Sequence, residues 1–288
     1  MVHAVQNSWL RYWAGAPEIT VIDPRSRTRY LSGHIPHAIW VPVSAAFGPD
    51  GRLLSDEALA KWLGESGVSN EGTVVVYGDS DGQAAAMLAW ILSYLGHPDV
   101  AILRTRLEHW RNDGGELAYR PEVANSENFT PRPQPELRAN WDDASKQAAP
   151  KLLDARSPEE YRGDKVVAED SPGHIPGAIN IPWLSFVGEN EELLCQPAEV
   201  LARLRKAGAN PDQDSVVYCR AAQRSSVAWL AMRLAGSPAR LYDGGILDWS
   251  QRAGASMDKG SSTTKKSTGV RSSRGPSARK KSVRRASS

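Results

Sequence analysis

The chain has 288 residues, of which 41% are hydrophobic, so it is long enough to form two globular domains with cores. No stretch approaches the roughly 18 apolar residues that a membrane span requires, and the N-terminus lacks a basic segment followed by an apolar run. We therefore predict a soluble, cytoplasmic protein that makes no membrane contact. Its two cysteines, Cys195 and Cys219, exclude a disulfide framework, and no Cys/His spacing indicates zinc, so we expect neither a metal nor another cofactor.

The net charge of +2 hides a strong asymmetry along the chain. From Lys259 onward there are ten Lys and Arg residues and no Asp or Glu, which leaves 25 basic and 33 acidic residues before it, a net charge of −8. The tail is rich in Ser, Lys and Arg and has little to bury, so we expect residues 255–288 to be disordered. Nonspecific contact with a polyanion is one expected role for this tail, and a solubilising extension without a partner is the other.

Short runs rich in Val, Ile and Leu alternate along the chain with segments that have helical spacing. Buried strands are predicted, in chain order, at residues 18–23, 72–78, 99–104, 151–156, 214–219 and 239–244. Helices, each ending at a glycine, are predicted at residues 55–67, 84–96, 197–208 and 224–236. This alternation indicates an α/β fold with mainly parallel sheets and helices on both faces. In such sheets the reactive groups gather where strands end and helices begin.

The chain contains the same series of motifs twice. Seven of ten positions are identical between GHIPHAIWVP at 33–42 and GHIPGAINIP at 173–182. Three further pairs keep the same order, namely VIDPR (21–25) with LLDAR (152–156), VVY (75–77) with VVY (216–218), and RLEHW (106–110) with GILDW (245–249). Four markers in one order indicate an ancestral duplication that produced two similar domains.

The two halves are joined by a segment, residues 119–141, that has four prolines and little hydrophobic periodicity. Proline fixes φ and removes a backbone donor, so an extended linker is expected here. We therefore predict four parts along the chain: a first domain at 1–120, a linker at 121–136, a second domain at 137–254 and the basic tail at 255–288.

Cys219 stands where a predicted strand ends and a helix begins near Arg224. Backbone N–H groups at a helix start carry partial positive charge, and a tight loop before the helix aims more of them at one point. Such dipoles favour a thiolate, and Arg220 and Arg224 add positive charge. The candidate site is the loop formed by Cys219, Arg220, Ala221, Ala222, Gln223, Arg224 and Ser225. The alternative, a buried and inert cysteine, is what we expect for Cys195, which has no basic loop beside it.

The two repeats, the paired DxR and GHIP motifs and the CRAAQRS loop resemble the tandem-domain rhodaneses, or thiosulfate sulfurtransferases, over residues 15–254. The resemblance implies two rhodanese-like domains, each with a mainly parallel sheet flanked by helices. It also implies that Cys219 takes a sulfane sulfur from thiosulfate, becomes a persulfide, and passes the sulfur to cyanide or a thiol acceptor. Within the family, a Cys-Arg pair such as Cys219-Arg220 is typical of members that prefer thiosulfate.

The first domain lacks the features that this chemistry needs. Gly78 stands where the second domain has Cys219, and the two acids Asp79 and Asp81 follow it. A loop with two carboxylates repels an anion, and it is also longer than its counterpart. We therefore expect an inactive first domain that walls one side of the cleft. Tandem rhodaneses commonly pair such a domain with an active C-terminal one.

Three other functions stay open at this point: a 3-mercaptopyruvate sulfurtransferase, a non-enzymatic persulfide carrier or binding module, and a Cys-dependent phosphatase or arsenate reductase. Phosphatases place five residues between the cysteine and the arginine, whereas four separate Cys219 from Arg224. Ser225 stands where the phosphatase arginine would be. The tighter loop suits a single sulfur atom better than a tetrahedral phosphoryl group.

The loop departs from the family pattern at several positions. Many members have glycine where this chain has Ala222, and a positive φ there would strain an alanine by about 1 kcal/mol. Vertebrate-type members have a lysine in the loop and an arginine on the helix after the DxR motif. This chain has Ala221 and Glu160 at those places, with Arg162 near enough to substitute for the missing arginine.

The histidines of the GHIP motifs, His34 and His174, occur in both halves, although only one half has the cysteine. We therefore expect them to support the turn rather than to catalyse, and the same holds for Asp23 and Asp154 at the strand ends. By contrast, the Asp243-Gly244-Gly245 turn occurs only in the second half. Glycine permits close backbone approach, so this turn is expected to line the active cleft.

Overall fold

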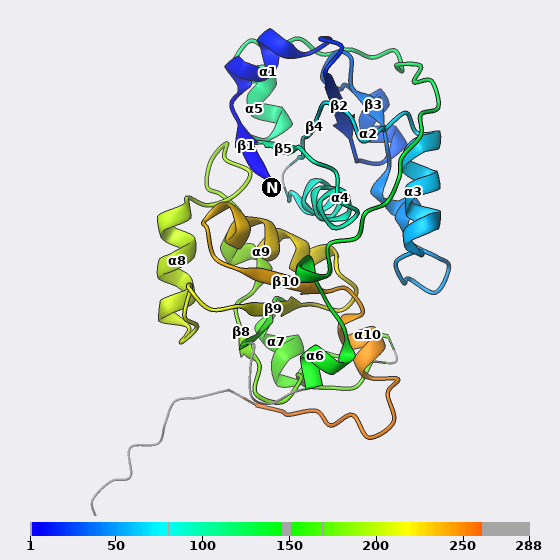
Figure 1. Cartoon of the computed structure of the whole chain (residues 1–288). Coiled ribbons are helices and arrows are strands. Elements are labelled where there is room, and N and C mark those ends of the chain that lie inside the picture. The colour runs from blue at the N-terminus through cyan, green and yellow to red at the C-terminus, as the bar shows by residue number, and fades with distance from the viewer. Residues whose placement is uncertain (1, 80, 146–150, 169, 261–288) are drawn as a thin grey trace, which may run out of the picture.

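The structure is a computed structural model that describes residues 2–79, 81–145, 151–168 and 170–260 (Figure 1). Two domains of the same architecture follow one another along this part of the chain. The basic tail is predicted at 255–288, and residues 261–288 of it lie outside the described residues. The prediction that these residues are disordered therefore also falls outside the described part of the chain.

Each domain is built on a five-stranded sheet in which all neighbouring strands are parallel. The first sheet has the order β1-β5-β4-β2-β3 and contains β1 (His3–Val5), β2 (Ile19–Asp23), β3 (Ile39–Trp40), β4 (Thr73–Val76) and β5 (Val100–Leu103). The second has the equivalent order β6-β10-β9-β7-β8 and contains β6 (Arg138–Ala139), β7 (Lys151–Asp154), β8 (Ile179–Asn180), β9 (Ser215–Tyr218) and β10 (Ala239–Tyr242). The predicted α/β fold with two similar domains is confirmed.

Helices connect the strands, as parallel neighbours require. The first domain has α1 (Asn7–Trp13), α2 (Arg27–Leu31), α3 (Asp56–Glu65), α4 (Gln83–Tyr94), α5 (Leu107–Asn112) and the short 3₁₀ helix η1 (Val43–Ala46). The second has η2 (Pro135–Leu137), α6 (Trp141–Ser145), α7 (Pro158–Arg162), η3 (Trp183–Phe186), α8 (Pro197–Lys206), α9 (Gln223–Leu234) and α10 (Gly245–Trp249). In the described part of the chain, no helix has the length and apolar character that crossing a membrane demands.

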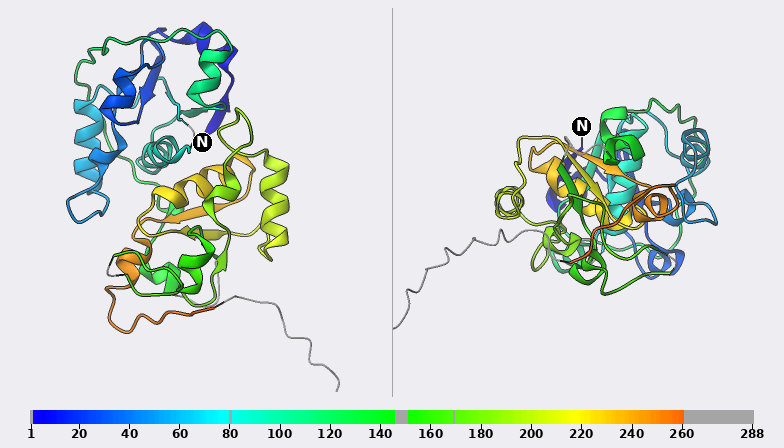
Figure 2. Two further views of the ribbon diagram at one scale, coloured as in Figure 1. Left: turned by 180° about the vertical axis from the view of Figure 1, so that it is seen from behind. Right: turned by 90° about the horizontal axis from the view of Figure 1, so that it is seen from below.

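The helices cover both faces of each sheet. Successive strand residues point to opposite faces, so Val74 and Val76 of β4 contact one core cluster while Val75 contacts another. On the face toward the other domain lie α4 and α9, which pack against each other between the sheets (Figures 1 and 2). Trp90 and Trp229, one from each of these helices, are fully buried in a single core cluster that runs through both domains. The two domains therefore share one hydrophobic core.

The proline-rich linker follows the surface of the first domain (Figure 1). Its backbone is fixed by hydrogen bonds from the amide of Glu127 to the carbonyl of Gly64 and from the amide of Arg132 to the carbonyl of Leu95, both 2.8 Å long. Phe129 is 6% exposed and joins the shared core. Residues 121–134 form no helix or strand, and the segment is bound along its length rather than free.

Each domain also extends a hairpin to the other. The second domain's hairpin is formed by residues 187–194. The two terminal guanidinium nitrogens of Arg106, in the first domain, donate to the carbonyls of Gly188 and Asn190 in this hairpin, at 2.6 and 2.7 Å. The first domain's hairpin carries Arg52, whose side chain donates to Asp248 at 3.1 Å and to Gln251 at 2.6 Å. These contacts join the ends of the sheets where the strand-to-helix loops lie.

The second domain continues past residue 254. Asp258 exchanges two backbone hydrogen bonds of 2.9 Å with His174, as Ala118 does with His34 in the first domain. Met257 packs on the core cluster of the second domain. We therefore propose that this domain ends near residue 260 instead of at 254.

We expect a chain that ends at residue 254 to unfold at a lower temperature than one that ends at 260. The shorter chain loses both backbone hydrogen bonds of Asp258 and the packing of Met257, together worth about 2 kcal/mol of the free energy of unfolding. Thermal unfolding followed by circular dichroism measures the difference, with the full-length protein as the control. Equal midpoints for the two shortened chains would place the boundary at 254.

Candidate active site around Cys219

Cys219 follows β9 directly, and α9 begins four residues later. The strand β9 lies between β10 and β7 near the middle of the second sheet, so its C-terminal end is enclosed by neighbouring strand ends. Cys219 is 1% exposed, and its carbonyl accepts a 3.0 Å hydrogen bond from the amide of Ile246. The thiol is thus held in a buried loop whose backbone is fixed on one side by the start of α10.

The loop closes through a tight turn at Ala222. This residue has φ 61° and ψ −44°, and the amide of Gln223 donates to the carbonyl of Ala221 at 2.7 Å, which is the bond of a γ-turn. Ala222 thus has the positive φ that strains an alanine. Few residues other than glycine adopt this conformation, so the alanine stores about 1 kcal/mol or more of strain at the base of the loop.

Backbone amides are the main donors that the loop offers. Among the described residues, none accepts a hydrogen bond from the amides of Arg220, Ala221, Ala222 or Arg224. They precede or begin a 12-residue helix, whose N-terminus carries partial positive charge. Unpaired amides grouped in one tight loop can bind an anion such as a thiolate or the sulfur atom attached to it.

Ser225 contacts the cysteine directly. Its Oγ lies 3.3 Å from the Sγ of Cys219 and 2.9 Å from the carbonyl of Ala222, and the residue is fully buried. A hydroxyl has one proton, so it can donate to the carbonyl while the thiol is protonated and turn toward Sγ when the thiolate forms. Ser225 is therefore placed to stabilise the charged form of Cys219.

Both loop arginines already have acidic partners. Arg224 binds the two carboxylate oxygens of Glu160 at 2.7 and 2.9 Å, and the Nε of Arg220 donates to Asp170 at 2.7 Å. Burial alone would favour the neutral acid, but the hydrogen bonds and charge of Arg224 outweigh it and lower the pKa of Glu160 to about 2. The sequence predicts two cations ready to attract an anionic substrate, whereas the structure shows two ion pairs.

The arginine substitute suggested by the sequence faces elsewhere. Arg162 donates to Asp164 at 2.7 Å, in an exposed pair that has no contact with the cysteine loop. The residues that sequence reasoning missed are the acidic partners, above all Asp170. A sequence pattern does point to an ordered side chain at Glu160. Ser157 and Glu160 have the spacing of a capping box, and they form one at the start of α7.

The glycine turn touches the loop, as expected for a residue that permits close approach. A Cβ on Gly245 would lie 2.4 Å from the carbonyl oxygen of Cys219 and 2.7 Å from that of Arg220, and φ is +52°. The amide of Leu247 donates to the same carbonyl of Arg220 at 3.1 Å. No other residue type fits at Gly245 without displacing the backbone of the cysteine loop.

The repeated DxR and GHIP residues form a buried frame below the loop. Arg156 binds both oxygens of Asp154 and also donates to the carbonyl of Gly173 at 2.7 Å. His174 stacks on Tyr161 and its Nδ1 lies 2.8 Å from that residue's carbonyl. In the first domain Arg25 binds Asp23 and the carbonyl of Gly33 in the same way, and the Nδ1 of His34 lies 2.9 Å from the carbonyl of Tyr30. The histidines and aspartates thus serve the turn, as predicted.

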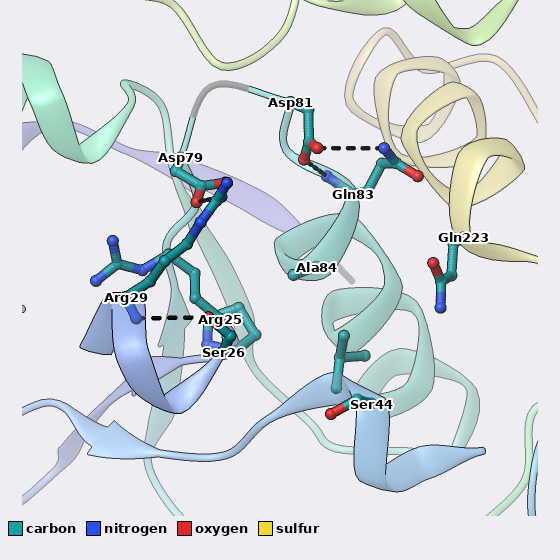
Figure 3. A pocket seen from close by; sticks show the side chains of 11 residues that line it. Arg25, Ser26, Arg29, Ser44, Asp79, Asp81, Gln83, Ala84 and Gln223 are labelled. Carbon is teal, nitrogen blue, oxygen red and sulfur yellow. Dashed lines mark hydrogen bonds and ion pairs between the residues drawn. The ribbon is translucent and has the colours of Figure 1, made fainter. Parts of the chain in front are cut away.

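The equivalent loop of the first domain lines a pocket of about 300 Å³ (Figure 3). Gly78 replaces the cysteine, and Asp79 is bound by Arg29 from α2. Burial raises the pKa of Asp79, and the charge of Arg29 offsets this only in part. Gln223 from the cysteine loop completes the lining, so the two loops lie next to each other across the domain boundary.

The second cysteine lies apart from this loop. Cys195 is 8% exposed, its Sγ lies 3.8 Å from the carbonyl of Ser185, and it lines a largely apolar pocket of about 400 Å³ between the domains. Burial raises the pKa of the Cys195 thiol. A thiol that stays protonated is a poor nucleophile, in agreement with the expectation of an inert residue.

Comparison with known proteins shows which families and structures the two domains resemble. A family model described as a rhodanese-like domain matches residues 6–113 and again residues 134–252. The sulfur carrier protein TtuD of Thermus thermophilus is 34% identical over 282 residues, which cover 89% of this chain and 96% of TtuD. SseA of Mycobacterium tuberculosis, provisionally named a thiosulfate sulfurtransferase, is 31% identical over 261 residues that cover 85% of this chain and 86% of SseA.

Two solved structures are also similar. SseA of Escherichia coli, described as a 3-mercaptopyruvate sulfotransferase, superposes with a TM-score of 0.76 at 28% identity and covers 85% of this chain and 99% of its own. A variant of EanB that carries a cysteine persulfide, solved with ergothioneine, has a TM-score of 0.80 at 27% identity. That match covers 90% of this chain and 70% of EanB.

We expect Gly245→Ala to destabilise the protein and to disturb Cys219. The positive φ costs an alanine about 1–2 kcal/mol, and the contacts below 3 Å with backbone oxygens add a displacement of the loop. Gly236→Ala is the matched control, because Gly236 also has a positive φ but has nothing within 4 Å of an added Cβ. Urea unfolding and the alkylation rate of Cys219 measure both effects. An equal loss in both variants would show that the contacts are unimportant.

We expect part of the acid sensitivity of the fold to come from Glu160. Its pKa of about 2 lies below its usual 4.5, so its ion pair stabilises the fold fully above pH 4.5 and progressively less as the pH falls toward 2. Glu160→Gln should therefore lower the free energy of unfolding by roughly 2–3 kcal/mol at pH 7 and by much less at pH 3. Urea unfolding at the two pH values measures this, and a pH-independent difference would contradict it.

Proposed function

This chain belongs to the rhodanese family, and from that premise we propose that it is a sulfurtransferase in which Cys219 carries the transferred sulfur. The observation that supports this most is the placement of a buried cysteine within a loop of unpaired amides at the start of α9. Thiosulfate is the donor that we propose first, and cyanide or a thiol is the acceptor. The proposed site residues are those of the loop, from Cys219 to Ser225.

The proposed reaction has two displacement steps. The thiol of Cys219 loses its proton to water, and the thiolate attacks the outer sulfur of thiosulfate. The sulfur–sulfur bond of thiosulfate breaks, sulfite leaves with the bonding electrons, and a cysteine persulfide forms. The acceptor then attacks the outer sulfur of the persulfide, so that cyanide leaves as thiocyanate and the thiolate of Cys219 is restored.

Each group of the loop has a part in these steps. The amides of Ala221 and Ala222 would stabilise the negative outer sulfur of the persulfide, as donors preorganised for a developing charge do. The hydroxyl of Ser225, 3.3 Å from Sγ, would donate to the thiolate before the attack and after the release. Arg220 and Arg224 would support the leaving sulfite where their carboxylate partners leave donors free.

A second candidate for the sulfur donor is 3-mercaptopyruvate. The solved structure of SseA from Escherichia coli, described as a 3-mercaptopyruvate sulfotransferase, supports it through 28% identity over 85% of this chain. The Cys219-Arg220 pair favours thiosulfate instead. Comparison of the two turnover rates in one assay, with cyanide as the acceptor, decides which donor the loop uses faster.

A persulfide carrier is the alternative to an enzyme with free turnover. It is supported by the 34% identity to TtuD, which is named a sulfur carrier protein. In this case a persulfide would form on Cys219 with thiosulfate but would reach cyanide slowly. Two measurements separate the roles: mass spectrometry after a single loading with thiosulfate detects the persulfide, and steady-state thiocyanate production gives the rate of its transfer to cyanide. A carrier would show the persulfide with slow thiocyanate production.

The first domain is proposed to take no sulfur itself. Gly78 offers no nucleophile, and Asp79 is bound to Arg29. Its contribution would be structural, because α4 supports α9 through the shared core and the hairpin at Arg52 contacts α10. Both α9 and α10 hold the cysteine loop in place.

We expect Cys219→Ser to abolish thiocyanate formation from thiosulfate and cyanide. A hydroxyl at this position is not ionised near neutral pH, so it neither attacks the sulfane sulfur nor carries it. Cys195→Ser, which removes the other thiol, is the control and should retain the activity. A mass increase of about 32 Da that maps to Cys219 after incubation with thiosulfate would identify the intermediate, since sulfur is the atom transferred. Equal activity of wild type and Cys219→Ser would reject the proposed function.

A further inference from the structure

In each domain an ion pair joins the loop after the central strand to a neighbouring helix. The loop supplies the cation and the helix the anion in the second domain, whereas the first domain has the opposite arrangement. In the second domain, Glu160 on α7 binds Arg224. In the first, Arg29 on α2 binds Asp79, as Figure 3 shows. Glu160 and Arg29 are both the third residue of a helix that begins after a serine cap, so they occupy equivalent positions.

The contact with Glu160 covers the Nη1–Nη2 edge of Arg224, one of the edges at which a guanidinium binds an oxyanion. Its Oε2 lies 2.7 Å from Nη1 and its Oε1 lies 2.9 Å from Nη2, the two-point geometry in which a guanidinium binds carboxylates and other oxyanions. The carboxylate is itself fixed, because Oε2 also accepts the amide of Ser157 at 3.2 Å, and Glu160 is 4% exposed. A donor anion would have to displace a group that is held at three points.

The second cation of the loop is neutralised in the same way. Arg220 donates through Nε to Asp170, whose side chain is 9% exposed. The two arginines and their two carboxylates therefore sum to zero charge beside Cys219. Such a site attracts a dianion much less than two free guanidinium groups would, since the field that concentrates an anionic substrate depends on the charge that remains unpaired.

We propose that Glu160 selects the sulfur donor by occupying Arg224, so that Cys219 takes sulfur poorly from small dianions and better from organic donors that carry a single negative charge. This inference rests on the proposed function and refines it. Thiosulfate remains a donor, but the loop binds it less tightly than it would if Arg224 were free of Glu160. The donors that the site favours have an organic group in place of one charged oxygen at the end facing Arg224.

Two donors that differ by one negative charge test whether the charge of the donor decides its use. Methanethiosulfonate differs from thiosulfate by a methyl group in place of one charged oxygen, and it presents the same kind of sulfane sulfur. With either donor the thiolate of Cys219 attacks the outer sulfur and the sulfur–sulfur bond breaks. Sulfite leaves in one case and methanesulfinate in the other, each with the bonding electrons, and the same persulfide results.

The test compares kcat/KM for the two donors in wild type and in Glu160→Gln, with cyanide as the acceptor. Glutamine can keep the capping contact with the amide of Ser157 while it releases the charge of Arg224. One freed charge-assisted contact should raise the thiosulfate value about tenfold or more relative to the methanethiosulfonate value. A ratio that stays at the wild-type level in Glu160→Gln overturns the proposal, even if both activities fall together.

Glu159→Gln is the matched control. It removes the same charge from the same helix, one residue away, but Glu159 is exposed and has no contact with Arg224. The donor ratio should stay at the wild-type level in this variant. An equal rise in both variants would show that only the overall charge matters and would reject a specific role for Glu160. Loss of transfer from both donors in the wild type would instead reject the proposed sulfurtransferase function.

A binding measurement avoids the chemistry altogether. In a Cys219→Ser background no sulfur is transferred, so thiosulfate acts only as a ligand that stabilises the folded state in proportion to its affinity. Thiosulfate should raise the unfolding temperature more when Glu160→Gln is added to that background than when it is absent. Equal shifts would mean that Arg224 gains no anion when Glu160 is neutralised, and the proposal would fail.

Discussion

The turn at Ala222 is the constraint on which the geometry of the cysteine loop depends. It reverses the chain within a few residues between the end of β9 and the start of α9, so Cys219 and the first amides of the helix meet at one place. The positive φ of an alanine there would relax if the surroundings allowed it. They do not, because the start of α10 holds the carbonyls of Cys219 and Arg220, and α9 is fixed by the shared core.

Duplication explains why the frame is so alike in the two domains and the chemistry so different. The DxR ion pair, the stacked histidine and the tyrosine at the end of the central strand occur twice, and they are buried both times. The loops above them have diverged: Cys219 with two arginines in one, Gly78 with two aspartates in the other. The frame resists change because each buried charge would lose its partner.

Much of the fold followed from the sequence, because it rests on local patterns. The valine-rich runs and the helices ending at glycine predict six of the ten strands and the four longest helices of the described residues. The short edge strands β1, β3, β6 and β8 are not among them, and the position of Cys219 at a strand end locates the loop. The partners of the loop arginines did not follow. Glu160 and Asp170 lie 64 and 50 residues from Arg224 and Arg220, and no periodicity links residues so far apart.

The same reason explains what was missed in the arrangement of the domains. The prolines predict an extended segment between the domains, but its attachment to the carbonyls of Gly64 and Leu95 depends on the tertiary fold. Likewise, the hairpins at Arg52 and at residues 187–194 look like ordinary surface loops in the sequence. Their roles become visible only when the other domain is placed beside them.

The exchange of these hairpins bears on how such a protein could have arisen. Either half alone would expose the apolar side of its central helix and leave an arginine without the carbonyls or carboxylate that it binds. A free half would therefore have a strong tendency to pair with a second copy of itself. Fusion of two copies in one chain makes that pairing permanent, so one copy can differ at the cysteine position, as Gly78 does, while the assembly keeps its shape.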